Sequence, residues 1–256
     1  MKISHPWSSA LVESVKRLYP VFSSYQAEPS SIGICPNCIS EHELEALFAK
    51  PLRILDAATI YHFAIVAVAT HGSVSDFKHF LPRVCELFPN ELCDMDSPEF
   101  YLNKLRYSDW LGWPEEEMLA VRAFMLEWWR WTLTNYPAKL PVWDAICAIA
   151  QAEDDLLPYL EAWDSQCGNG WTALRQLVDF YQHDLIVHGR QNRLSLGSFW
   201  EERSRQEAQV CCWLLREETR RHIERAAHEY ATKWHAEQEI AHILIHHDVW
   251  RNKQPS

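Results

Sequence analysis

The chain has 256 residues, of which 48% are hydrophobic and only seven are glycine. A chain of this length can bury a core without disulfide bonds, and its scarcity of glycine favours helices over strands. The formal net charge of −11 argues against binding to nucleic-acid phosphates and favours a basic protein partner, with solubility as the simpler explanation of the charge.

Helix start signals are clear in the first third of the chain. Ser40 and Glu43 form a capping-box pattern, which predicts a helix that runs to Ala49. Asp56 is a predicted N-cap for a second helix over residues 57–70. No alternating pattern typical of strands interrupts these helices.

The rest of the chain continues in the same way. Proline and acidic residues mark helix starts at residues 98 and 114, and further helices are predicted over 141–151, 155–163 and 170–188. A second capping-box pattern at Ser198 and Glu201 precedes a long stretch that lacks glycine and proline, in which we expect a break near residues 216–219. The result is an all-α protein of roughly ten helices, arranged as an irregular helical array that could be HEAT-like.

Charge is distributed unevenly along the chain. Residues 1–189 contain 13 Lys and Arg against 25 Asp and Glu, a net charge of −12, whereas residues 190–256 contain 11 against 10, a net charge of +1. We therefore predict an acidic helical body over 1–189 and a C-terminal helical subdomain over 190–256, which could equally pack as one single domain. Glutamates interleave with the arginines of the second segment and predict a salt-bridged helix surface.

The N-terminus lacks the continuous apolar stretch of a signal peptide, and the longest apolar run, residues 57–70, is shorter than the ~20 residues that span a bilayer. We expect a cytoplasmic protein with no membrane partner. The eight cysteines are scattered and do not form the pattern of a secreted disulfide framework.

Cys35 and Cys38 form a CPNC motif just before a predicted helix. Two thiolates at this spacing suit half of a tetrahedral zinc site, so a structural zinc ion is possible here, with free loop thiols as the alternative. A complete site needs two more ligands. Candidates from nearby or neighbouring helices are His42, His79, Cys85 and Cys93.

Several segments together resemble an uncharacterised family of bacterial proteins of similar length. They are CPNC, PLRIL, DFKHFLPRVCEL at residues 76–87, KLRYSDWLGWPEEE and FWEERSRQEAQVCCWL. The resemblance covers most of the chain and implies an all-helical intracellular protein. It implies no activity and no binding residues.

Within DFKHFLPR, helical spacing predicts three buried residues, after which Pro82 should end or kink the helix. The three are Phe77, Phe80 and Leu81. His79 and Arg83 then flank the apolar edge. We expect them to pair with acidic neighbours rather than to bind a metal or other ligand.

A second candidate metal site follows the spacing of one helical stripe near the C-terminus. Its residues are His235, Glu239, His242 and His246. The simpler alternative is that these residues form a solvated polar face, because the apolar face of this helix is predicted on another side. That face would consist of Tyr230, Trp234, Ala241, Leu244 and Ile245.

His-Asp pairs occur at residues 183–184 and 247–248. They suggest an alternative function, a metal-dependent hydrolase that uses His and Asp residues on helices. However, the sequence holds no complete catalytic set, which favours a non-enzymatic role.

The chain has 13 tryptophans, and its densest cluster is EWWRW at residues 127–131. On a helix, Phe124, Trp128 and Trp131 share one face and Trp129 points elsewhere. Core packing explains such a cluster, and an exposed Trp129 beside Arg130 would instead suit a protein-binding hot spot. With the acidic charge, this composition predicts a soluble intracellular protein-interaction module that binds a basic protein partner.

Overall fold

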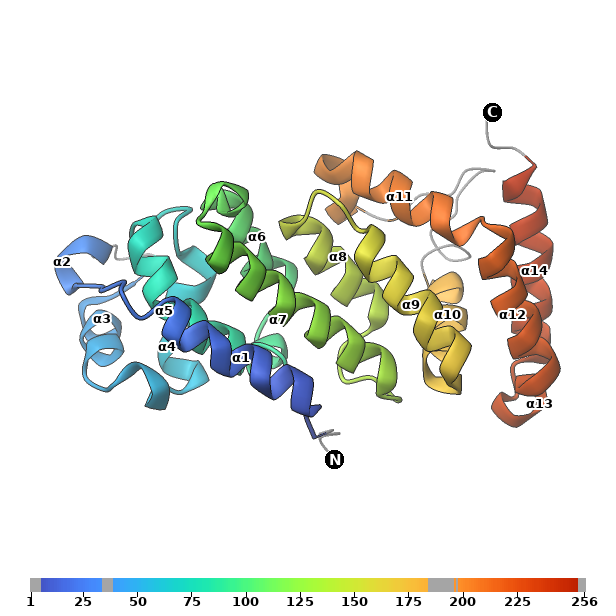
Figure 1. Ribbon diagram of the computed structural model, residues 1–256, viewed down its shortest axis with the longest axis horizontal. Coiled ribbons are helices and arrows are strands. Elements are labelled where there is room, and N and C mark those ends of the chain that lie inside the picture. Colours follow the sequence, from blue (N-terminus) through green and yellow to red (C-terminus); the bar gives the residue numbers. More distant parts are fainter. Residues whose placement is uncertain (1–5, 34–38, 184–195, 197, 253–256) are drawn as a thin grey trace. The chain divides into compact units, whose positions relative to one another are not determined.

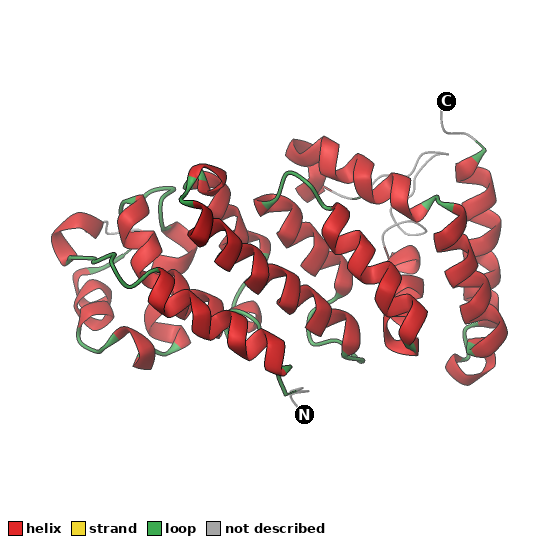
Figure 2. Ribbon diagram, viewed as in Figure 1, coloured by secondary structure: helices red, strands yellow, loops and turns green. Residues whose placement is uncertain are grey.

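The structure is a computed structural model, and it describes residues 6–33, 39–183, 196 and 198–252. Over these residues the protein is all-α, which confirms the predicted fold class (Figures 1 and 2). Fourteen α-helices and no strand occur in the described ranges, in which Ala67 and His71 form an isolated bridge. Two of the helices, α2 (Pro29–Ile32) and α13 (Ala231–Trp234), are single turns, which are too short to produce a periodic pattern in the sequence. The HEAT-like arrangement stays a prediction.

The chain divides into two compact units, an N-terminal unit of residues 1–128 and a C-terminal unit of residues 129–256. The division falls inside the longest helix, α7 (Glu115–Thr134). The boundary that charge predicts, between residues 189 and 190, lies in a segment outside the described residues.

The N-terminal unit is built from six helices and the first part of α7. Besides α2 they are α1 (Ser9–Val21), α3 (Glu41–Phe48), α4 (Ala57–Val66), α5 (Val74–Leu87) and α6 (Glu99–Tyr107), with single 3-10 turns at Leu52–Ile54, Leu92–Asp94 and Trp110–Gly112. The predicted caps are present: Ser40 and Glu43 form a capping box on α3, and the Asp56 carboxylate accepts a hydrogen bond from the Thr59 N–H at 2.9 Å. Local hydrogen bonding therefore sets these starts.

One predicted helix end is wrong, and at Pro82 the structure excludes one of the two expected outcomes, an end of the helix. The helix that begins after Asp56 ends at Val66 and not at residue 70, because Val68 takes a left-handed conformation with φ of 64° and its N–H bonds to the His71 carbonyl. Pro82 does not end its helix either, since α5 continues to Leu87. Proline removes one backbone hydrogen bond, but Phe80, Leu81 and Pro82 are buried, and this packing holds the helix together past the missing bond.

Aromatic side chains form the core of the N-terminal unit. Phe88 packs edge-on against Trp128 with ring centroids 4.7 Å apart, and Phe63 lies 4.7 Å from Phe80. Phe77, Phe80 and Leu81 are all buried, as their helical spacing predicts. This core also contains a charged group, because the Lys78 ammonium lies 2.6 Å from the Glu117 carboxylate in an ion pair that is almost fully buried.

The C-terminal unit contains the end of α7 and seven further helices. Besides α13 they are α8 (Val142–Ala152), α9 (Leu157–Asn169), α10 (Trp171–Phe180), α11 (Ser204–Leu214), α12 (Glu217–Glu229) and α14 (Glu237–Arg251). The predicted break near residues 216–219 is confirmed, because α11 ends at Leu214 and α12 begins at Glu217. A 3-10 helix, Ser198–Arg203, precedes α11.

Tryptophans also build the core of the C-terminal unit. Trp129 packs edge-on against Trp163 at 5.3 Å and donates its ring N–H to the Tyr159 carbonyl, and Trp163 stacks on Trp213 at 5.0 Å. Trp128, Trp129 and Trp131 are all buried. Core packing is thus the correct interpretation of the EWWRW cluster, and an exposed hot spot at Trp129 is wrong.

Candidate functional site

The CPNC motif, Cys35 to Cys38, lies outside the described residues, so the zinc half-site stays a prediction. The structure does place its suggested additional ligands. Cys85 is buried on α5, where burial raises the pKa of its thiol and disfavours the thiolate that zinc needs. The His79 Nδ1–H donates a hydrogen bond to the Tyr25 carbonyl at 2.9 Å, while His42 is exposed on α3.

The predicted His stripe near the C-terminus is split by a break between two helices. His235 has a φ of 53° and closes α13, whereas Glu239, His242 and His246 belong to α14. The Nε2 atoms of His242 and His246 lie 2.6 Å apart. Within the parts of the chain that the structure describes, no three His, Cys, Asp or Glu side chains are grouped to share a metal ion.

The predicted apolar face of the last helix is wrong. Its buried positions are Ile240, Ile243, His247 and Trp250, whereas Ile245 is 62% exposed. The break at His235 resets the phase of the helix, so a stripe that is drawn continuously from residue 230 onwards points to the wrong side of α14.

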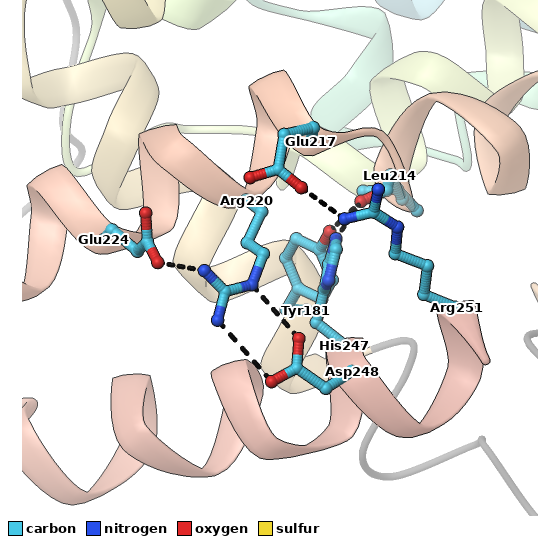
Figure 3. A network of polar contacts seen from close by, with 8 residues as sticks. All are labelled: Tyr181, Leu214, Glu217, Arg220, Glu224, His247, Asp248 and Arg251. Carbon is cyan, nitrogen blue, oxygen red and sulfur yellow. Dashed lines mark hydrogen bonds and ion pairs between the residues drawn. The ribbon is translucent and has the colours of Figure 1, made fainter.

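His247 and Asp248, one of the two predicted His-Asp pairs, act separately (Figure 3). His247 is fully buried, and its Nε2 atom donates to the Leu214 carbonyl at 3.1 Å. Burial lowers the pKa of its ring. Asp248 is exposed and pairs with Arg220 at 3.1 Å. The two side chains therefore do not converge on a common metal or substrate, and Asp184 of the other pair lies outside the described residues.

The charged residues around this pair hold α12 against α14, the two helices that run side by side in Figures 1 and 3. Arg220 bonds to Asp248 on α14 and to Glu224 on its own helix, and Arg251 of α14 pairs with Glu217 of α12. The salt-bridged helix surface predicted from the interleaved charges is thus confirmed for α12. Three of its four carboxylates, those of Glu217, Glu224 and Glu229, pair with arginines of the same chain.

An acidic pocket in the N-terminal unit presents charge that is not occupied in this way. We use this name for a pocket of about 410 Å³ lined by Pro29, Ser30, Gly33, Glu41, Leu44 and Glu45, from α2, the residue after it and α3. Leu44 is buried and supplies an apolar wall, while the two glutamates are exposed. Neither Glu41 nor Glu45 forms an ion pair with any residue that the structure describes.

The glutamate between them has a different role. Glu43 accepts hydrogen bonds from the Ser40 hydroxyl and the Ser40 N–H and pairs with His62, and these contacts lower the pKa of its carboxyl to about 2. Glu43 therefore completes the capping box and belongs to the helix itself. Glu41 and Glu45 make no such hydrogen bonds. Glu41 lies in the first turn of α3, where the helix dipole favours a negative charge, whereas two like charges one turn apart on a helix cost about 0.2–0.5 kcal/mol.

The acidic pocket has the chemistry to bind a cationic side chain with an aliphatic stem. Lysine and arginine combine these two parts, so the stem can contact Leu44 while the charged end meets the two carboxylates. The sequence does indicate that Glu41 and Glu45 share one helix face, because they are four positions apart. This pair could not be recognised as a site, because the opposite wall comes from α2, whose position only the structure gives.

No known protein family, curated protein or solved structure matches this chain. The resemblance to an uncharacterised bacterial family therefore stays a prediction. Of the helices in the described ranges, none is both long and apolar enough to cross a lipid bilayer.

Proposed function

We propose that this protein is a non-enzymatic, cytoplasmic protein-interaction module that binds a basic segment of a partner protein in the acidic pocket. The observation that carries the proposal is the exposed pair of carboxylates, Glu41 and Glu45, which form no ion pair with any described residue and lie beside the apolar wall of Leu44. A partner's cation would pair with both carboxylates and remove the repulsion between them.

The charge of the surrounding unit supports the same partner. Residues 1–128 contain 10 Lys and Arg against 17 Asp and Glu, a net charge of −7. This field attracts a basic protein from a distance and accelerates its association, and the pocket then contributes the local contacts that select a particular segment.

The proposal can be tested with a fluorescein-labelled peptide of alternating arginine and leucine as the probe, measured by fluorescence anisotropy. The double variant Glu41→Gln, Glu45→Gln should weaken binding about 5- to 30-fold, since each exposed ion pair contributes about 0.5–1 kcal/mol. The loss should shrink at high salt, because exposed charges are screened.

Glu115 and Glu116 offer a matched control, because they are two exposed glutamates of the same unit, in the first turn of α7. The variant Glu115→Gln, Glu116→Gln removes the same charge and should leave binding within about twofold, since single exposed charges act weakly over a distance. Equal losses in both double variants would show that only net charge attracts the peptide. Equal losses, or no binding to the unaltered protein, would refute the proposal.

A further inference from the structure

A second pocket of about 500 Å³ lies in the N-terminal unit, where the end of α1 meets the 3-10 turn at Leu52–Ile54 and the middle of α5. We call it the aromatic pocket. Its apolar lining is made chiefly of rings: Tyr19, Phe22 and Tyr25 contribute aromatic rings, and Pro20, Pro51 and Pro82 contribute pyrrolidine rings. Pockets that enclose small-molecule ligands have this size and a mostly apolar lining.

The two tyrosine hydroxyls of the aromatic pocket are already occupied. Tyr19 donates to Glu86, which also accepts a hydrogen bond from Arg83 at 2.7 Å, and Tyr25 donates to Glu117. These bonds fix both rings before any ligand arrives. A preformed wall loses little freedom on binding, which favours a small rigid ligand.

Arg53 provides one open polar group in the aromatic pocket. Its guanidinium lies over the Tyr19 ring, 3.6 Å from the ring centroid, and the side chain is exposed. It forms no ion pair with a residue in the described part of the chain. A guanidinium held over an aromatic face keeps its N–H groups for other partners, and their planar arrangement suits a carboxylate.

His79 provides the second open group. A carbonyl oxygen only accepts, so the bond to Tyr25 uses the Nδ1–H, and in this tautomer the other ring nitrogen, Nε2, is the acceptor. The ring is held edge-on against Phe80, with centroids 4.7 Å apart and an angle of 88° between the planes. Arg53 and His79 therefore give the pocket one planar set of N–H donors and one acceptor, beside the Ser23 hydroxyl and the Gln26 amide that also line it.

We infer that the aromatic pocket binds a small aromatic carboxylate that also carries an N–H or O–H donor. The ligand ring packs among the tyrosine and proline rings, its carboxylate pairs with Arg53, and its donor bonds to His79 Nε2. This inference is independent of the proposed function, because it rests on residues that do not line the acidic pocket.

Isothermal titration calorimetry with indole-3-propionate as the probe tests the inference, and two close analogues separate its parts. Indole-3-propionamide lacks the charge, and 1-methylindole-3-propionate lacks the ring N–H. In the unaltered protein, the amide should bind at least tenfold more weakly than the acid, and the N-methyl acid about threefold more weakly, because a charge-assisted hydrogen bond contributes more than a neutral one.

Variants then assign each difference to a residue. Arg53→Gln should abolish the preference for the acid over the amide, and His79→Leu should abolish the preference for the free N–H. Arg17→Gln is the matched control, because Arg17 is an exposed arginine of α1 that does not line the pocket, and it should bind the acid as the unaltered protein does.

Three results would overturn the inference: no binding of the acid, equal affinity for acid and amide, or the same loss in Arg17→Gln as in Arg53→Gln. The first two are measured on the unaltered protein, so they decide the question even if a variant fails to fold. None of these results depends on the arginine–leucine peptide. If the inference about the aromatic pocket is wrong, the proposal that the acidic pocket binds a basic segment is not affected.

Discussion

Replacing Lys78 with methionine should be among the most destabilising single substitutions in the N-terminal unit. The Lys78 Nζ atom lies 2.6 Å from a Glu117 carboxylate oxygen, and the two side chains are only 8% and 9% exposed. The same ammonium bonds to the Tyr25 hydroxyl at 3.1 Å and lies 4.3 Å from the centroid of the Trp113 ring. Methionine fills a similar volume but leaves the Glu117 charge buried without its partner.

The expected cost follows from that uncompensated charge. Breaking a buried ion pair from one side costs about 3–5 kcal/mol, a large share of the roughly 5–15 kcal/mol that stabilises a typical domain. The double variant Lys78→Met, Glu117→Leu removes both charges and should cost less than Lys78→Met alone, because no isolated charge remains.

Amide hydrogen exchange followed by mass spectrometry suits this comparison, since it reports opening free energies for each helix separately. Peptides from α5 and from the start of α7 should lose protection in Lys78→Met and regain much of it in the double variant. Peptides from α12, in the other unit, serve as the internal reference. A loss below about 1 kcal/mol in Lys78→Met, or costs that simply add in the double variant, would refute the reasoning.

Two further predictions concern His247 and the cysteine motif. Burial lowers the pKa of His247 in the folded protein, so the unfolded chain binds a proton at this imidazole more readily. The free energy of unfolding therefore keeps its full value above the pKa of the unfolded state, about 6.5, and decreases as the pH falls from there towards the pKa of the folded state. The variant His247→Gln keeps a donor for the Leu214 carbonyl and should reduce the drop in urea midpoint between pH 7 and pH 5.5, and an unchanged drop would contradict this. If the CPNC motif holds a structural zinc ion, elemental analysis of untagged protein should find zinc that is lost in Cys35→Ser and retained in His242→Ala, whereas free loop thiols predict metal-free protein. Metal-free protein, or loss of metal with His242, would count against a zinc clip at CPNC.

The helix starts after Ser40 and Asp56 could be predicted from the sequence because their causes are local, whereas the capping-box pattern at Ser198 begins a 3-10 helix and α11 starts only at Ser204. The capping box at Ser40 and the N-cap at Asp56 each join residues that are three positions apart, so both interactions can be recognised in the local sequence. The break before Glu217 was also predictable in position. The all-α class follows in the same way from propensity and spacing.

Helix ends and helix faces needed the tertiary structure. Pro82 remains inside α5 because the surrounding core compensates for its missing hydrogen bond, and a sequence pattern does not contain that compensation. The left-handed residue His235 separates α13 from α14, and within α14 His247 is buried and Ile245 is exposed. One backbone conformation thus reverses a prediction that was drawn from spacing alone.

The two candidate sites show the same limit. Glu41 and Glu45 stand together in the sequence, but the wall that makes them a pocket comes from α2. Arg53 and His79 lie 26 positions apart in the printed sequence, and only the fold brings them to one cavity with the end of α1. The sequence by itself determined which segments are helical, since a helix closes hydrogen bonds between near neighbours. The tertiary structure decided which side chains meet, because burial joins residues that are distant along the chain.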